Sequence, residues 1–93
     1  LLALQEHQPQ LAVIAVDELL LNESPATTDA RRRLLSDLER FATRNPNDPW
    51  TYFLTAQILL AQDNPDHARL ALAEFTRLCP TDDCRAQSKR LLP

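Results

Sequence analysis

The pattern of apolar and polar positions predicts an all-α chain. Apolar residues recur at spacings of three and four, the period of an amphipathic helix. We expect helices over Pro9–Leu21, Asp29–Arg44 (or from Thr28), Pro49–Gln62 and Pro65–Cys79. Two of these have a start signal, because Asp48 precedes Pro49 and Asn64 precedes Pro65. The polar turn at 63–64 is so short that the last two helices must pack antiparallel.

A fixed period relates the two halves of the chain. Pro46 and Pro80 stand 34 residues apart, and Phe41 and Phe75 repeat at the same offset, as do Leu38 and Leu72. This period is typical of paired-helix repeats. Residues 49–80 resemble a tetratricopeptide repeat unit in detail.

The resemblance rests on four positions. Ala56 and Ala68 look like the small residues that let the two helices of such a unit approach closely, Phe75 fills the wider end, and Pro80 resembles the proline that closes the unit. The chain departs from the family pattern at Thr55, where Leu is usual, and at Leu59, where Tyr is usual.

The resemblance implies one domain over residues 1–93, with about two repeats and a capping helix. Repeat 1 is expected over 9–46 and repeat 2 over 49–80, and the capping helix over 81–92, with Thr81 as its cap. Helix 9–21 aligns with the start of repeat 2 only at an offset of 40, which predicts a turn insertion near 22–27. Because the chain starts mid-pattern without Met, we expect it to be a fragment of a longer protein.

Composition and charge narrow the class of partner. The net charge of −3 argues against a nucleic-acid partner, and the basic run at 31–33 fans out over about 200° of a helix, as a solvated face does. We expect Arg33 to pair with Asp37 one turn later. The chain has no glycine, so it lacks the Gly-rich loop that binds phosphate. No apolar run has the length of a membrane span, so no direct membrane insertion is expected.

No pattern in the sequence indicates catalysis, so we expect no enzyme activity, no catalytic residue and no cofactor. His67 is isolated on a polar face, His7 lies near the start of the chain, and no Ser or Cys stands in a nucleophile motif. A zinc site would need His67 or His7 to join Cys79 and Cys84, and His67 lies about 18 Å of helical rise from Cys79, so no metal is expected.

The two cysteines, Cys79 and Cys84, allow two interpretations. They bracket a short turn, so their Cα atoms could lie within the roughly 4.4–6.8 Å that a disulfide needs. Such a bond would stabilise the fold by on the order of 2–3 kcal/mol and would imply an oxidising compartment such as the bacterial periplasm or cell envelope. The alternative is two packed thiols in a reducing cytoplasm. The absence of a competing Cys favours the disulfide.

The resemblance also implies a concave groove lined by the first helix of each repeat. If Tyr52, Ala56 and Leu59 face the sibling helix, the groove and its partner-binding residues are Trp50, Phe53, Gln57 and Leu60. Two aromatics, an amide and an aliphatic side chain suit an apolar peptide or helix. The alternative is that Trp50 and Phe53 pack on helix 29–44 as interior residues.

Two functions follow from these patterns. The first is a non-catalytic protein–protein interaction scaffold in a larger, bacterial assembly, or, as a variant, a chaperone-like holder of a secreted subunit. A carboxylate clamp of the chaperone-binding type is not expected, because Phe53 and Gln57 stand where such repeats place Lys, Asn and Arg. The second is a self-association module in which apolar helix 9–21 pairs with a copy of itself to form a homodimer. The scaffold predicts a monomer and the module a concentration-dependent dimer.

Overall fold

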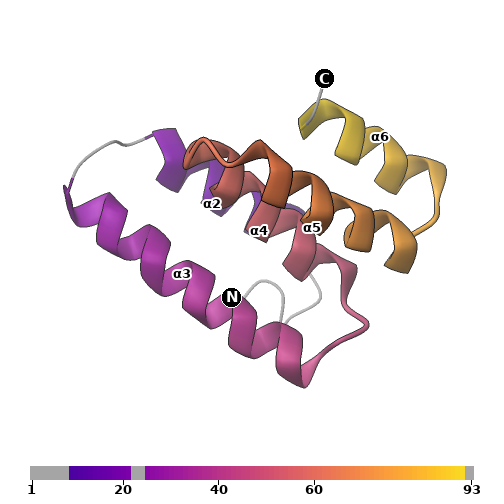
Figure 1. Cartoon of the computed structure of the whole chain (residues 1–93), viewed down its shortest axis with the longest axis horizontal. Helices are drawn as coiled ribbons and strands as arrows, with labels where there is room; N and C mark the ends of the chain where they lie inside the picture. Colours follow the sequence, from indigo (N-terminus) through magenta and orange to yellow (C-terminus); the bar gives the residue numbers. More distant parts are fainter. Residues whose placement is uncertain (1–8, 22–24, 92–93) are drawn as a thin grey trace.

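The computed structural model describes residues 9–21 and 25–91. These residues form five helices and no strand: α2 (Pro9–Leu21), α3 (Pro25–Arg44), α4 (Pro49–Ala61), α5 (Pro65–Leu78) and α6 (Asp82–Leu91) (Figure 1). The predicted all-α fold class is therefore confirmed. None of the described helices is both long enough and apolar enough to span a membrane.

Helix α4 lies at the centre of the arrangement. It packs most extensively on α5, antiparallel across the short turn, and also contacts α2 and α3. Figure 1 shows α3 and α6 on opposite sides of the α4–α5 pair. Because each helix packs mainly on its neighbours in this way, the arrangement is that of a small helical bundle of repeat-like form.

The largest departure from the expected boundaries is at the start of α3. The helix begins at Pro25, three or four residues before the expected start at Thr28 or Asp29. Proline is well suited to the first position of a helix, because its missing N–H would have no intrahelical partner there. Half of the expected turn insertion at 22–27 is therefore helical, and residues 22–24 lie outside the described residues. Helices α4 and α5 each end one residue earlier than expected.

Two clusters of buried side chains hold the helices together. The first joins α2, α3 and α4 and consists of Ala12, Val16, Leu38, Leu54 and Ile58. The second joins α4, α5 and α6 and consists of Phe53, Ala56, Ala68, Leu72, Phe75 and Cys84. Helix α4 contributes to both, so the two clusters share one wall. Ala56 and Ala68 are fully buried, which permits the close approach of α4 and α5.

The turn between α4 and α5 shows how a chain without glycine ends a helix. Asp63 adopts a left-handed backbone conformation with φ of 58°. Asn64 N–H donates to Leu59 O at 2.9 Å, and Asp63 N–H donates to Leu60 O at 3.1 Å. These two bonds form a Schellman motif, in which glycine is the usual left-handed residue and Asp is among the few others that tolerate it.

The predicted start signals differ in how they act. The Asp48 carboxylate accepts a hydrogen bond from Trp50 N–H at 3.0 Å, and the Thr81 hydroxyl accepts one from Cys84 N–H at 3.2 Å, so both residues cap their helices. Asn64 makes no side-chain cap bond. Its Oδ1 lies 2.9 Å from His67 Nδ1 instead. Asn64 still directly precedes the first residue of α5, so the expected helix start is confirmed.

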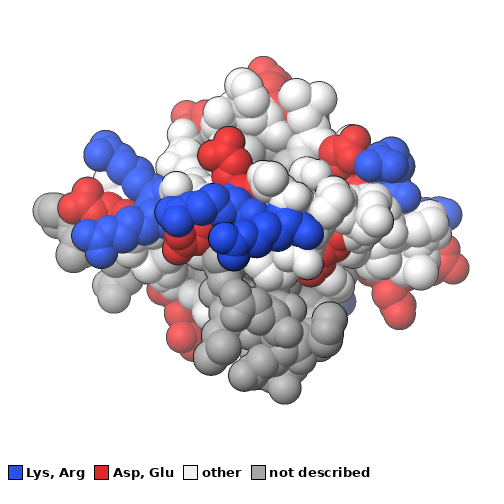
Figure 2. All heavy atoms as spheres, turned by 90° about the horizontal axis from the view of Figure 1, so that it is seen from below, with Lys and Arg blue, Asp and Glu red and all other residues white. Residues whose placement is uncertain are grey.

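Acidic side chains flank the basic residues on the face of the molecule where α3 lies. Figure 2 views the molecule from the side on which α3 lies in Figure 1, and a band of Lys and Arg runs across it with Asp and Glu on either side. The expected Arg33–Asp37 pair is wrong, because Asp37 pairs with Arg40 at 3.4 Å. Arg31 is half-buried and donates to Leu20 O at 3.3 Å, in the last turn of α2, where the helix dipole favours a cation.

The clusters predict where truncation destabilises the protein. Leu38 is 1% exposed in the first cluster, so Leu38→Ala should lower the free energy of unfolding by about 2–5 kcal/mol. Leu70 is 67% exposed on α5, so Leu70→Ala should change it by less than about 0.5 kcal/mol. Urea unfolding followed by circular dichroism measures both. Equal losses for the two variants would contradict the placement of α3 on α4.

Candidate binding pocket between α4 and α6

The four residues expected to line a groove do not share one environment. Phe53 and Gln57 are buried, at 2% and 3% exposure, whereas Trp50 and Leu60 are half-buried. Phe53 packs in the second cluster, against α5. Trp50 packs against both clusters. Of the four, only Trp50 also lines a cavity that is described below, so it is the starting point for a site.

Two aromatic rings, those of Phe53 and Phe75, fix the position of Trp50. Its ring centroid lies 5.5 Å from that of Phe53 and 5.1 Å from that of Phe75, with interplanar angles of 63° and 62°. The centroids of Phe53 and Phe75 are 5.0 Å apart. Edge-on contacts of this kind are favourable because the positive edge of one ring meets the negative face of another. The trio therefore holds the Trp50 indole in one orientation at the start of α4.

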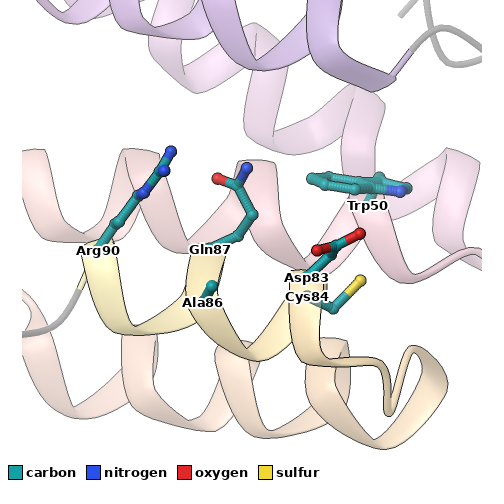
Figure 3. A pocket seen from close by; sticks show the side chains of 6 residues that line it. All are labelled: Trp50, Asp83, Cys84, Ala86, Gln87 and Arg90. Carbon is teal, nitrogen blue, oxygen red and sulfur yellow. The ribbon is translucent and has the colours of Figure 1, made fainter.

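A pocket of about 290 Å³ lies between Trp50 and α6. Its other lining residues are Asp83, Cys84, Ala86, Gln87 and Arg90. Figure 3 shows the Asp83, Gln87 and Arg90 side chains rising from α6 on the side where Trp50 lies. The pocket thus combines an aromatic surface from α4 with polar groups from α6, which is the mixture that ligand-binding clefts commonly present.

The charged groups of the pocket have no partner among the described residues. Arg90 and Asp83 form no ion pair there, whereas Asp82 on the same helix pairs with Arg85 at 3.7 Å. The Trp50 indole nitrogen donates to no described residue and is not among the buried polar atoms. Asp83 and Arg90 are seven positions apart, about 10 Å along the helix, so the pocket presents an acid at one end and a cation at the other.

The sequence predicted a capping helix at this place but not a binding surface on it. Asp83, Gln87 and Arg90 recur at spacings of four and three, while Cys84 and Leu91, on another face, pack into the second cluster. A polar stripe on a helix is usually a solvated face. It becomes a pocket wall here because Trp50 lies beside it.

The two cysteines form a disulfide at the N-terminal end of α6. Their sulfur atoms are bonded to each other and their Cα atoms are 6.0 Å apart. Cys79 directly follows α5, and Cys84, 5% exposed, belongs to the second cluster and to the pocket wall. Of the two interpretations of the sequence, the structure contains the disulfide. The compartment that such a bond would imply stays a prediction.

A second cavity, of about 330 Å³, lies between α3 and α4. Its walls are Leu35, Leu38, Glu39, Ala42, Thr51, Tyr52 and Thr55. Thr55 is the position where the resembled family usually has Leu, and its hydroxyl donates to Thr51 O at 2.8 Å. A short and partly polar side chain at this position leaves room between the helices.

A buried polar link joins α4 to α2. Gln57 Nε2 donates to Asp17 Oδ1 at 2.7 Å and lies 3.5 Å from Val13 O. Gln57 Oε1 is buried without a described partner. Because a buried amide is costly unless it is hydrogen-bonded, Gln57 positions α2 on α4 and is not an open groove residue in this structure.

The histidine and the shifted pKa values lie outside the pocket. Among the described residues, no three His, Cys, Asp or Glu side chains gather as a metal site would require. His67 is exposed on α5, and His7 lies outside the described residues. The pKa of the Glu74 carboxyl is lowered because Arg77 donates hydrogen bonds to it, and the pKa of Arg77 is raised for the same reason. Both belong to an exposed ion pair on α5.

The link between Gln57 and Asp17 predicts coupled stability effects. Asp17→Ala removes the acceptor and should lower the free energy of unfolding by about 1–3 kcal/mol, because it leaves the Gln57 amide group without its hydrogen-bond acceptor. In a Gln57→Leu background, Asp17→Ala should lower the free energy of unfolding much less. The difference between the two backgrounds, the coupling energy, should be at least about 0.5 kcal/mol in urea unfolding. Glu18→Ala, an exposed neighbour, is the control. Strict additivity would contradict the link.

Comparisons with protein-family models, with curated proteins and with solved structures found no match to this chain. The resemblance to tetratricopeptide repeats therefore rests on the residues named above, and it stays a prediction.

Proposed function

We propose that this chain is a non-catalytic interaction module that binds a protein or peptide partner at the pocket between α4 and α6. The observation that carries the proposal is the half-buried Trp50, held edge-on by two buried rings and facing polar groups that have no described partner. Binding energy in protein interfaces is concentrated in a few rigid residues, with Trp and Arg strongly enriched among them. The pocket contains one residue of each type, Trp50 and Arg90.

The pocket favours a particular partner chemistry. An apolar side chain of the partner would pack on the Trp50 indole, because that surface is already ordered and costs little entropy to use. An acidic group of the partner would meet Arg90, which can hold a carboxylate with two parallel hydrogen bonds. An apolar peptide or short helix with one acidic residue beside its anchor satisfies both requirements. In the tetratricopeptide interpretation, Trp50 lies on the inner side of the first helix of repeat 2.

The disulfide supports a setting for this function. Disulfides persist in oxidising compartments, so the bond between Cys79 and Cys84 favours the periplasm or cell envelope over the cytoplasm in this proposal.

Self-association is the second candidate, and one observation favours it. Helix α2 is mostly apolar, with Asp17 and Glu18 as its two charged residues, and Ile14 is 54% exposed on it. A helix of this composition is normally covered on both faces. A concentration-dependent dimer in sedimentation that Ile14→Glu abolishes, with Leu70→Glu as the exposed control, would support this candidate instead.

A peptide selection tests the pocket. Random 12-residue peptides displayed on phage are selected on the wild-type protein, and affinities are read from the fluorescence of Trp50, the only tryptophan of the chain. Selected peptides should combine apolar and acidic residues, and Arg90→Ala should weaken them about tenfold. Lys89→Ala removes the same charge from outside the pocket and should change affinity less than about twofold. Failure to select any peptide, or equal affinities for the two variants, would contradict the proposal.

A further inference from the structure

The pocket exists only while α6 is in place. Five of its six lining residues belong to α6, and Trp50 is the only one that does not. Whatever attaches α6 to the rest of the molecule therefore controls the site.

The noncovalent attachment of α6 is slight. Its packing is mainly on α5, and among its described residues only Cys84 is fully buried, with Leu91 partly packed against the same cluster. Most of its other side chains are charged or exposed. A helix of ten residues does not hold its conformation in water without tertiary support, and this one receives support at only two positions.

The hydrogen bonds at the start of α6 do not add to this attachment. Thr81 caps the helix through Cys84 N–H, Arg85 N–H donates to Thr81 O, and Arg85 Nη2 donates to Pro80 O. The Arg85–Asp82 ion pair is likewise internal. All of these partners lie within residues 80–85. They order the turn and the first turn of α6, but they leave its position relative to α5 undetermined.

The disulfide is the contact that fixes this position. Cys79 terminates α5, and its bond to Cys84 holds the first turn of α6 against the end of that helix. The same Cys84 is part of the pocket wall, beside Trp50 (Figure 3). A cross-link that closes so short a loop shifts the equilibrium between docked and undocked α6 by roughly 30-fold or more.

We propose that the Cys79–Cys84 disulfide is a redox-controlled tether that keeps α6 over Trp50 and so keeps the pocket formed. A dithiol reductant supplies two electrons and two protons, the S–S bond breaks to give two thiols, and the reductant closes its own disulfide. Helix α6 then detaches, the pocket loses five of its six lining residues, and the Trp50 indole is exposed to water. Helices α2 to α5 stay folded, because the α4 side chains remain packed in both clusters.

The tether can be tested without any ligand, because Trp50 is the only tryptophan. Trp50 emission, acrylamide quenching and far-ultraviolet circular dichroism are compared for the oxidised protein and for the protein reduced with tris(2-carboxyethyl)phosphine. Reduction should raise the quenching constant about twofold or more, move the emission to longer wavelength and remove helical signal equivalent to about ten residues.

Cys79→Ala is the matched variant. It removes the bond but keeps a small apolar group at position 79 and leaves the buried Cys84 side chain in place. It should resemble the reduced wild type without any reductant, and adding reductant should change nothing further. This control separates loss of the bond from loss of Cys84 packing.

Three results would overturn the tether. The first is unchanged quenching and dichroism after mass spectrometry shows that two hydrogens have been added and the bond is open. The second is a purified protein whose mass shows no disulfide. The third is loss of the entire helical signal on reduction, since the bond would then support the whole fold and not α6 alone.

The consequence for binding rests on the proposed function and is measured separately. Peptides selected on the oxidised protein should bind at least about tenfold more weakly after reduction. Equal affinities in the two states, with the fluorescence change present, would overturn control of the site but not the tether. If no peptide is selected, the interaction proposal fails, while the ligand-free fluorescence still decides whether the tether exists.

Discussion

Burial of α4 is the constraint on which the remaining structure depends. This helix has six buried residues, on more than one face, and it carries no charged side chain. A helix that is buried on more than one face has to be surrounded. Helix α5 covers one side with Ala68, Leu72 and Phe75, and α2 and α3 cover another with Ala12, Val16 and Leu38. The other helices of the described chain pack around α4 or, as α6 does, onto its main partner.

The same constraint determines what is left for recognition. Because the middle of α4 is buried by packing, Phe53 and Gln57 are interior residues, and Trp50, at the first turn of α4, is the aromatic residue that lines the pocket beside α6. The polar half of the site then has to come from another element. Helix α6 supplies it, and α6 is the helix with the weakest noncovalent attachment. The pocket and the disulfide tether therefore follow from one arrangement, because most of the pocket wall lies on α6, the least buried helix.

Much of the fold could be predicted from sequence because helix starts are local signals. Pro9, Pro49 and Pro65 stand at first helical positions, and Asp48 and Thr81 cap through their own side chains. The start of α3 at Pro25 was missed because the offset between the two halves suggested an insertion there, and a helix beginning inside that insertion leaves the 34-residue period unchanged.

The site was harder to predict, for a physical reason. The polar face of an amphipathic helix shows which of its sides is buried. Helix α4 has no distinct polar face, so the sequence pattern could not show which of its sides packs on which helix. The choice of Tyr52, Ala56 and Leu59 as the sibling-facing side left out Phe53, which also packs on α5. The partner of Asp37 was missed because two arginines, one four positions before it and one three after, were both within reach. Tertiary packing decides such alternatives.

Native-state hydrogen exchange, resolved by residue, tests the central claim most directly. If α4 is the shared wall of both clusters, its amides from Phe53 to Ile58 should exchange only through global unfolding and be the slowest of the described chain, with α6 the fastest of the helices in reduced protein. If the α4 amides instead exchange as fast as those of α6, the central position of α4, and the account built on it, would be contradicted.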